Sequence, residues 1–237
     1  MPAIPKSTLF AYYWDDPEPF RAGLTPAGQT GLEILPGASV YHMNLSVSDD
    51  LSMVSGQVEV RYENRESIPL DEIQFRLFPN ILGGEMQIAS TLVNGKAVTP
   101  GYDLENSVLR VPLSPDLAPG QQAVVSLSFG TRVPKTTALN YGVLSNAGGV
   151  LAYAHGYPMI AVYNAEGWNT EIPPQYGDVT FNDASFYIVR IDAPNDLVLA
   201  AAGSEIKREE ADGRQVVTFA DGPARSGYGG ARAGGFF

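Results

Sequence analysis

Apolar and polar side chains alternate along most of the chain from Tyr41 onward. This period of two is typical of half-buried antiparallel strands, and the Pro, Gly, Asn and Asp clusters that interrupt it predict turns. Many short strands separated by turns predict an all-β fold, either a curved antiparallel sheet or a β-sandwich. The expected strands are Tyr41–Val47, Val54–Tyr62, Ile73–Phe78, Met86–Val93, Lys96–Val98, Val108–Leu113, Ala123–Val133, Ser185–Ala193, Leu197–Ala202 and Val216–Ala220.

The start of the chain lacks this alternation and is rich in proline and aromatic residues, which predicts an irregular arm. The leucines of Phe20–Leu35 are spaced for one face of a short helix, although Pro26 and Gly28 weaken that pattern. The chain therefore divides into three parts. These are an arm with a short helix over residues 1–40, a β domain over 41–225 and a glycine-rich tail over 226–237.

The segment Gly148–Phe181 interrupts the strand pattern. It contains His155, one of two histidines in the chain, and Trp168, one of two tryptophans. Aromatic residues and glycines between regular strands are typical of an ordered loop at a functional site. A long loop folded over an apolar core explains the same composition equally well.

Composition narrows the possible classes of function. The chain has 237 residues, of which 44% are apolar, so it can bury a substantial core. A net charge of −11 argues against binding to nucleic acid or to an anionic membrane surface. Cysteine is absent, which excludes disulfides, thiolate metal ligands and cysteine nucleophiles. The sequence shows neither a long apolar run that predicts a membrane span nor an intact signal peptide at its start.

Motifs for the common catalytic sites are missing from the sequence. It contains no HExxH zinc motif, no GxSxG nucleophile elbow and no glycine-rich phosphate loop. His42 falls on the polar side of a predicted strand, where we expect a solvated side chain. Glu166, Glu171 and Asp178 lie near the interrupting segment and leave open a hydrolase that uses paired carboxylates.

Several segments, taken in order, resemble the N-terminal β domain of the zinc aminopeptidases related to aminopeptidase N and leukotriene hydrolase. Tyr157-Pro158 stands where that family has Phe-Pro, and Leu117–Gly120 resembles its L-x-P-G turn. The Asp-Glu-Pro that follows Phe-Pro in the family is not present, which indicates a divergent bacterial branch. The segments with the resemblance are Tyr41–Asn64, Leu70–Asn80, Leu109–Pro134, Gly149–Asn169 and Ala184–Gly203.

The resemblance implies a saddle-like, non-catalytic domain that caps a zinc-binding catalytic domain. Zinc is expected in that second domain, and no cofactor is expected in this chain. In the family, a loop of the β domain contacts the free amino terminus of the peptide substrate, and by position this loop is Leu151–His155. It lacks the Gln or Glu that usually makes this contact. The implied substrate-binding residues, for each of which core packing is a competing role, are Tyr153, Ala154, His155, Tyr157 and Trp168.

The sequence leaves one further class open, a β-sandwich module that binds carbohydrate or protein. An exposed Trp168 with coplanar tyrosines beside it would favour that class. The resemblance also predicts an exposed apolar patch where the catalytic domain packs, and a truncation or frame change near Arg225, where the glycine-rich tail departs from the family. The compartment stays open, since the family is often exported but no signal peptide is seen.

Overall fold

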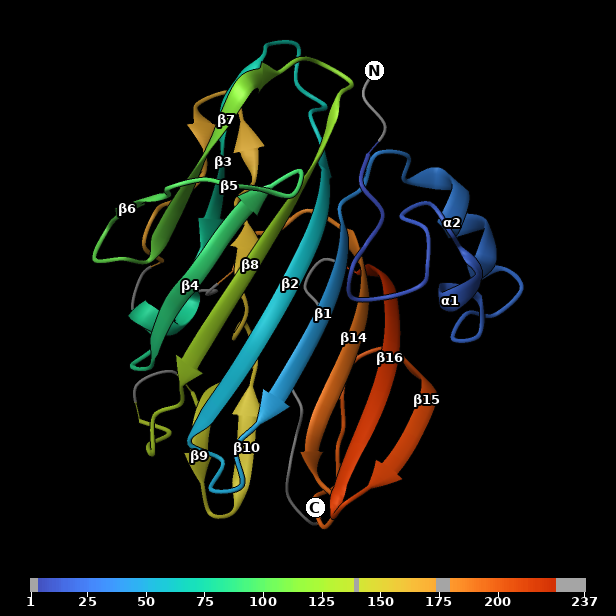
Figure 1. The fold of residues 1–237 in the computed structure, drawn as a ribbon, viewed down its shortest axis with the longest axis vertical. Helices are drawn as coiled ribbons and strands as arrows, with labels where there is room; N and C mark the ends of the chain where they lie inside the picture. The colour runs from blue at the N-terminus through green and yellow to red at the C-terminus, as the bar shows by residue number, and fades with distance from the viewer. Residues whose placement is uncertain (1–3, 139–140, 174–179, 225–237) are drawn as a thin grey trace.

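A computed structural model describes residues 4–138, 141–173 and 180–224. Within them the largest element is an eight-stranded sheet with the order β15-β16-β14-β1-β2-β8-β4-β5 (Figure 1). Its strands are β1 (Val40–Val47), β2 (Met53–Glu63), β4 (Glu85–Val93), β5 (Lys96–Ala97), β8 (Gln122–Arg132), β14 (Ser185–Pro194), β15 (Ser204–Ala211) and β16 (Arg214–Ala224). The all-β fold predicted from the sequence is confirmed.

Smaller sheets complete the described fold. A four-stranded sheet has the order β11-β3-β7-β6, and two hairpins pair β9 with β10 and β12 with β13. A short 3₁₀ helix, η2 (Phe78–Ile81), follows β3. The strands are β3 (Leu70–Arg76), β6 (Gly101–Asp103), β7 (Val108–Leu117), β9 (Leu144–Ala147), β10 (Val150–Tyr153), β11 (Met159–Ile160), β12 (Tyr163–Asn164) and β13 (Gly167–Trp168).

The large sheet is mixed rather than purely antiparallel. Strands β1 and β14 run parallel, in a register that extends from Val40 opposite Phe186 to Ser46 opposite Asp192. The remaining neighbours in this sheet are antiparallel. A parallel pair needs a long connection between its strands, and here most of the chain separates β1 from β14. The expectation of an antiparallel sheet is therefore wrong for this central pair.

Successive residues of a strand point to opposite faces of a sheet, and the large sheet buries apolar residues on both faces. On β1, Tyr41, Met43 and Leu45 belong to the main core. Strands β3 and β7 contribute to the same core, so the four-stranded sheet packs on this inner face. Val40 of β1 belongs to a second apolar cluster on the outer face.

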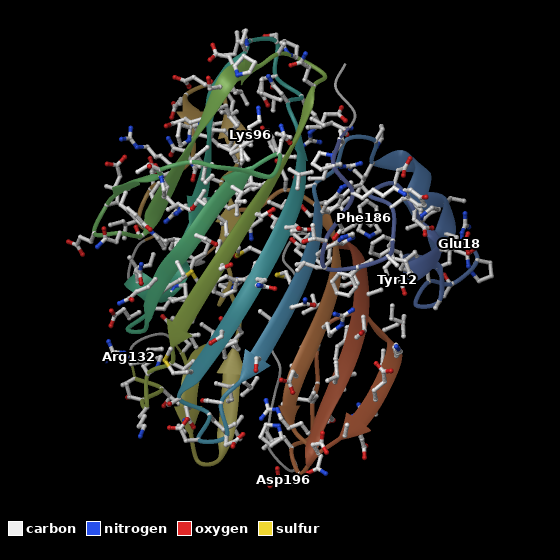
Figure 2. The ribbon with its side chains drawn as sticks, viewed as in Figure 1. Tyr12, Glu18, Lys96, Arg132, Phe186 and Asp196 are labelled. Atoms are coloured by element: carbon white, nitrogen blue, oxygen red, sulfur yellow. The ribbon has the colours of Figure 1, made fainter. Side chains whose placement is uncertain are left out.

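The N-terminal arm covers the outer face of the large sheet. In Figure 1 it is the blue segment that lies over one end of β1, β14 and β16. Phe10, Trp14 and Phe20 of the arm pack in the second cluster against Phe186 and Ile188 of β14. Figure 2 shows Phe186 at the place where the arm crosses the sheet. The molecule thus has three layers, namely the arm, the large sheet and the smaller sheets.

The predicted short helix of the arm is present in pieces. The arm forms α1 (Glu18–Arg21), η1 (Gly28–Thr30) and α2 (Gly31–Ile34), each one turn long or less. Pro26, Gly28 and Gly31 interrupt the pattern, and such residues disfavour a continuous helix. Because these turns are so short, packing on the sheet rather than helix propensity stabilises the arm.

Two expectations about individual segments are wrong. Leu197–Ala202, which was expected to be a strand, has no regular structure, and β15 begins after it at Ser204. His42 was expected to be solvated, yet its side chain is fully buried, with 0% of its surface exposed. Its ring stacks on Trp14 at a centroid distance of 4.3 Å, because the arm covers the polar face of β1. The expected change near Arg225 and the tail lie outside the described residues.

Candidate functional site

The segment that interrupts the strand pattern folds into short strands. The β9–β10 hairpin precedes the turn at His155, β11 joins the four-stranded sheet, and the β12–β13 hairpin places Trp168. Residues 174–179 of this segment, which include Asp178, lie outside the described part of the chain. The segment is therefore an ordered chain of turns and strands as far as it is described.

Tyr153 closes a tight turn at the end of β10. Its side chain is 2% exposed, and its hydroxyl donates to the carbonyl oxygen of Gly156 and lies 3.0 Å from Oγ1 of Thr131. Burial raises the pKa of Tyr153. A Cβ on Gly156 would overlap the ring of Tyr153, and His155 has a φ of 55°, in the left-handed region. Packing and hydrogen bonds together fix this turn in one conformation.

His155 and Ala154 form the middle of the turn and are both buried. The amide of Ala154 donates to the carbonyl oxygen of Val143 at 2.8 Å. The ring of His155 lies 5.8 Å from that of Phe78, and burial lowers the pKa of His155 to about 4. At neutral pH the imidazole is therefore neutral, so it can accept a hydrogen bond but does not present a positive charge.

Tyr157 joins the interrupting segment to the large sheet through a cluster of tyrosines. It is 1% exposed and contacts Tyr41 and Tyr187 edge-on at 6.0 and 6.1 Å. Tyr41 and Tyr187 stack at 4.9 Å, and the hydroxyl of Tyr41 accepts a hydrogen bond from the amide of Ile160 at 3.0 Å. Burial raises the pKa of Tyr41. The segment after Pro158 is thereby held against the main core.

Trp168 lies apart from this cluster and is only partly buried. Its ring is perpendicular to that of Tyr163 at 5.1 Å and tilted by 46° from that of Tyr62 at 6.0 Å. A flat platform that stacks on a sugar needs coplanar, exposed rings. The geometry around Trp168 thus lacks the feature that would have favoured a carbohydrate-binding module.

Sequence reasoning missed Arg76, which lies beside the His155 turn. This residue is 5% exposed, its guanidinium lies 4.8 Å above the ring of Phe78, and it pairs with Met159 in the sheet register. Its Nε and Nη2 atoms have no hydrogen-bond partner among the described residues, and burial lowers its pKa. A lone arginine within the otherwise apolar Phe75–Phe78 was the available signal.

Three further features bear on the kind of site, namely metal ligands, membrane-spanning helices and exposed apolar surface. They contain no group of three or more His, Cys, Asp or Glu side chains placed to hold a metal ion. Among them, no helix has the length and apolar character needed to cross a bilayer. The large apolar side chains that are most exposed come from separate segments, so the apolar patch stays a prediction. They are Tyr13, Tyr141, Phe181 and Val198.

Solved structures that are similar to this chain include M1 zinc metallopeptidases. The enzyme of Deinococcus radiodurans, as an E323A mutant, matches with a TM-score of 0.55 and 20% identity over 77% of this chain. The same mutant with a Tyr-Ser-Ala substrate bound matches with a TM-score of 0.54 and 19% identity over 77%. A two-domain M1 zinc metallopeptidase with L-tryptophan bound matches with a TM-score of 0.55 and 20% identity over 78%.

These matches cover only part of each enzyme, 38% of the Deinococcus chain and 40% of the two-domain enzyme. The chain therefore has the fold of a portion of M1 zinc metallopeptidases, as the sequence resemblance predicted. No protein-family model and no curated protein sequence matches it. At this level of identity the likeness concerns the fold.

Proposed function

We propose that this chain serves as the non-catalytic β domain of a zinc aminopeptidase and packs against a separate catalytic domain. The fold likeness to a portion of M1 zinc metallopeptidases is the observation that supports this proposal most directly. The rigid turn at Tyr153–Gly156 supports it further, since a loop that positions a substrate works best when its conformation is fixed in advance.

Within this function, the loop Leu151–His155 and its neighbours border the site for the amino terminus of the peptide. A substrate ammonium group in a partly dry cleft needs carbonyl or other acceptor atoms around it. The neutral imidazole of His155 and the backbone carbonyls of the turn are of that kind. Tyr153 donates to the carbonyl oxygen of Gly156, and Tyr157 packs against Tyr41 and Tyr187, so we assign both tyrosines to positioning the turn. Trp168 borders an apolar part of the cleft.

Association with a catalytic domain tests the proposal. The genomic sequence beside this chain is searched for a polypeptide with an HExxH motif, which the proposal predicts. The purified chain is mixed with that polypeptide, complex formation is followed by size-exclusion chromatography, and hydrolysis of leucine p-nitroanilide is measured. We expect no hydrolysis by the chain alone, a complex with the partner, and hydrolysis that rises when the chain is added. Zinc-dependent hydrolysis by the chain alone, or a partner whose activity is indifferent to the chain, contradicts the proposal.

Substitution of His155 tests the assignment of the turn. In the reconstituted enzyme, His155→Ala should raise KM for leucine p-nitroanilide by about 10-fold and change kcat less, because it removes an acceptor that binds the ammonium group. Lys96→Ala, at the exposed start of β5, is the control and should leave both constants unchanged. Equal constants for wild type and His155→Ala would remove this residue from the site.

A further inference from the structure

A small cavity lies between the N-terminal arm and the outer face of the large sheet, far along the chain from the His155 turn. We call it the arm cavity. Its volume is about 170 Å³, and its apolar walls include the rings of Trp14, Phe20 and Phe186. The rings of Phe20 and Phe186 are 5.0 Å apart. An apolar cavity of roughly 150 Å³ holds a ligand as large as benzene, so this one admits a small organic molecule.

The walls of the arm cavity are formed before any ligand arrives. The indole of Trp14 is held by two contacts. Its Nε1 donates to the carbonyl oxygen of Pro5 at 2.8 Å, and the ring of His42 stacks on its face. The arm itself is anchored to Glu59, whose carboxylate accepts from Ser7 Oγ at 2.7 Å and from the amide of Thr8 at 2.9 Å. A preformed pocket binds with little ordering cost.

A buried arginine contributes to the same cavity. Arg61 of β2 is 9% exposed, and its Nη2 donates to the carbonyl oxygen of Ala38 at 2.6 Å. Its Nε atom has no hydrogen-bond partner among the described residues, and burial is the main cause that lowers its pKa. A buried donor without an acceptor is costly. The acceptor that suits a guanidinium best is a carboxylate.

A carboxylate of the arm adds an opposite charge at the cavity. Asp15 borders it and acts electrostatically on the guanidinium of Arg61, although Glu63 has the larger effect on that group. The other carboxylates nearby have protein donors, since Asp16 accepts from the amide of Glu18 at 3.0 Å and Glu63 accepts from Gln122 at 2.6 Å. A ligand in the cavity therefore meets an apolar wall, the guanidinium of Arg61 and the carboxylates of Asp15 and Asp16.

We propose that the arm cavity binds a free α-amino acid with an apolar side chain of about the size of leucine. Its α-carboxylate accepts hydrogen bonds from Arg61, its ammonium group lies beside Asp15, and its side chain packs between Trp14, Phe20 and Phe186. A purely anionic ligand would satisfy Arg61 but be repelled by Asp15, and a purely cationic one would do the reverse. This site is separate from the His155 turn and does not depend on the proposed peptidase role.

Fluorescence of Trp14 reports occupancy directly. The chain has two tryptophans, so the Trp168→Phe variant leaves Trp14 as the only one, at the wall of the cavity. We titrate this variant with L-leucine, with L-leucinamide, which lacks the carboxylate and mimics a peptide amino terminus, and with N-acetyl-L-leucine, which lacks the ammonium and mimics a carboxyl terminus. L-leucine should saturate the signal and bind at least about 10-fold more tightly than either analogue, since each loses a charge-assisted hydrogen bond.

Variants then test the two charged groups. Arg61→Gln should weaken leucine binding by at least about 10-fold, whereas Arg76→Gln, a change of the other buried arginine with an unpartnered Nε, should leave it unchanged. If circular dichroism shows that Arg61→Gln does not fold, Asp15→Asn decides, because Asp15 is exposed and the fold does not rest on it. A Trp14 signal that does not respond to leucine, analogues that bind as tightly as leucine, or leucine binding unchanged in Asp15→Asn overturns the proposal.

Discussion

At the scale of single residues, the outer face of β1 and β2 shows that the polar residues of an alternating strand can be buried. His42, Glu59 and Arg61 alternate with apolar residues and so resemble a solvated face in the sequence, yet all three are less than a tenth exposed. The arm covers them and supplies partners, such as Ser7 and Thr8 for Glu59. The alternation identified correctly which residues share a face, but it could not show that a distant segment covers that face.

Burial of His42 makes stability depend on pH. Burial, together with the nearby charge of Arg61, lowers the pKa of His42 to about 4, against 6.5 for an exposed histidine. Above pH 6.5 the imidazole of His42 is mostly neutral in both the folded and the unfolded chain. Between pH 6.5 and 4 the unfolded chain takes up a proton that the folded chain does not, so stability falls by about 3 kcal/mol over this window.

The variant His42→Phe should remove this contribution. Urea unfolding measured at pH 7 and pH 4.5 should show a smaller loss of stability on acidification in His42→Phe than in wild type. His155 has a similarly lowered pKa, so the variant should retain part of the loss. Replacement of Tyr102 by Phe, on the exposed strand β6, is the control and should leave the pH dependence intact. An equal loss in wild type and His42→Phe would show that His42 does not contribute.

At the scale of elements, the sequence predicted strands wherever apolar and polar residues alternate over several positions. Strands β1, β2, β4, β8 and β14 were all expected within a few residues of their ends. The charged run of β15 has no apolar face and was missed, since its side chains are mostly exposed at the sheet edge. The parallel pairing of β1 with β14 was also missed, because register between distant strands is not encoded in local alternation.

In the candidate site, too, local features of the sequence could be predicted, whereas contacts between distant segments could not. The sequence located an aromatic-rich segment between regular strands, and the structure folds its described part into short strands and turns. Which aromatic residues are buried could not be predicted, because it depends on partners from other elements, such as Thr131, Tyr187 and Phe78. Arg76 belongs to the same case, since its neighbours come together only in the fold.

A glycine on β2 provides a test of packing between elements. Gly56 lies opposite Phe129 of β8, and a Cβ at this position would overlap the ring of Phe129, which is itself 4% exposed. Gly56→Ala should therefore lower the free energy of unfolding by about 1–3 kcal/mol. Gly130→Ala on the neighbouring strand is the matched control, since its Cβ would meet only Met53 Cε at 3.8 Å. Urea unfolding compares the two, and similar stabilities would contradict the packing argument.

At the scale of the whole molecule, the arm is a structural layer on the large sheet rather than an appendage. It buries Phe10 and Trp14 against the sheet, shields His42 and forms one wall of the arm cavity. The proposed partner domain and the arm therefore need not compete for one surface, since the His155 turn belongs to the main core on the other face. A single large sheet thus has room for two separate functions.

Deletion of residues 1–17 tests the role of the arm. It removes the buried side chains of Phe10 and Trp14, with the partly buried Leu9 and Tyr12, from the second apolar cluster and uncovers one end of the outer face of β1 and β14. Each such side chain contributes about 1.5–3 kcal/mol when buried, so stability should fall by at least about 2 kcal/mol. Binding of the dye ANS should rise, because apolar surface becomes exposed, while the far-ultraviolet circular dichroism of the sheet persists. An unchanged urea midpoint together with unchanged dye binding would mean that the arm does not stabilise the sheet, and it would also remove the physical basis for a ligand cavity beneath it.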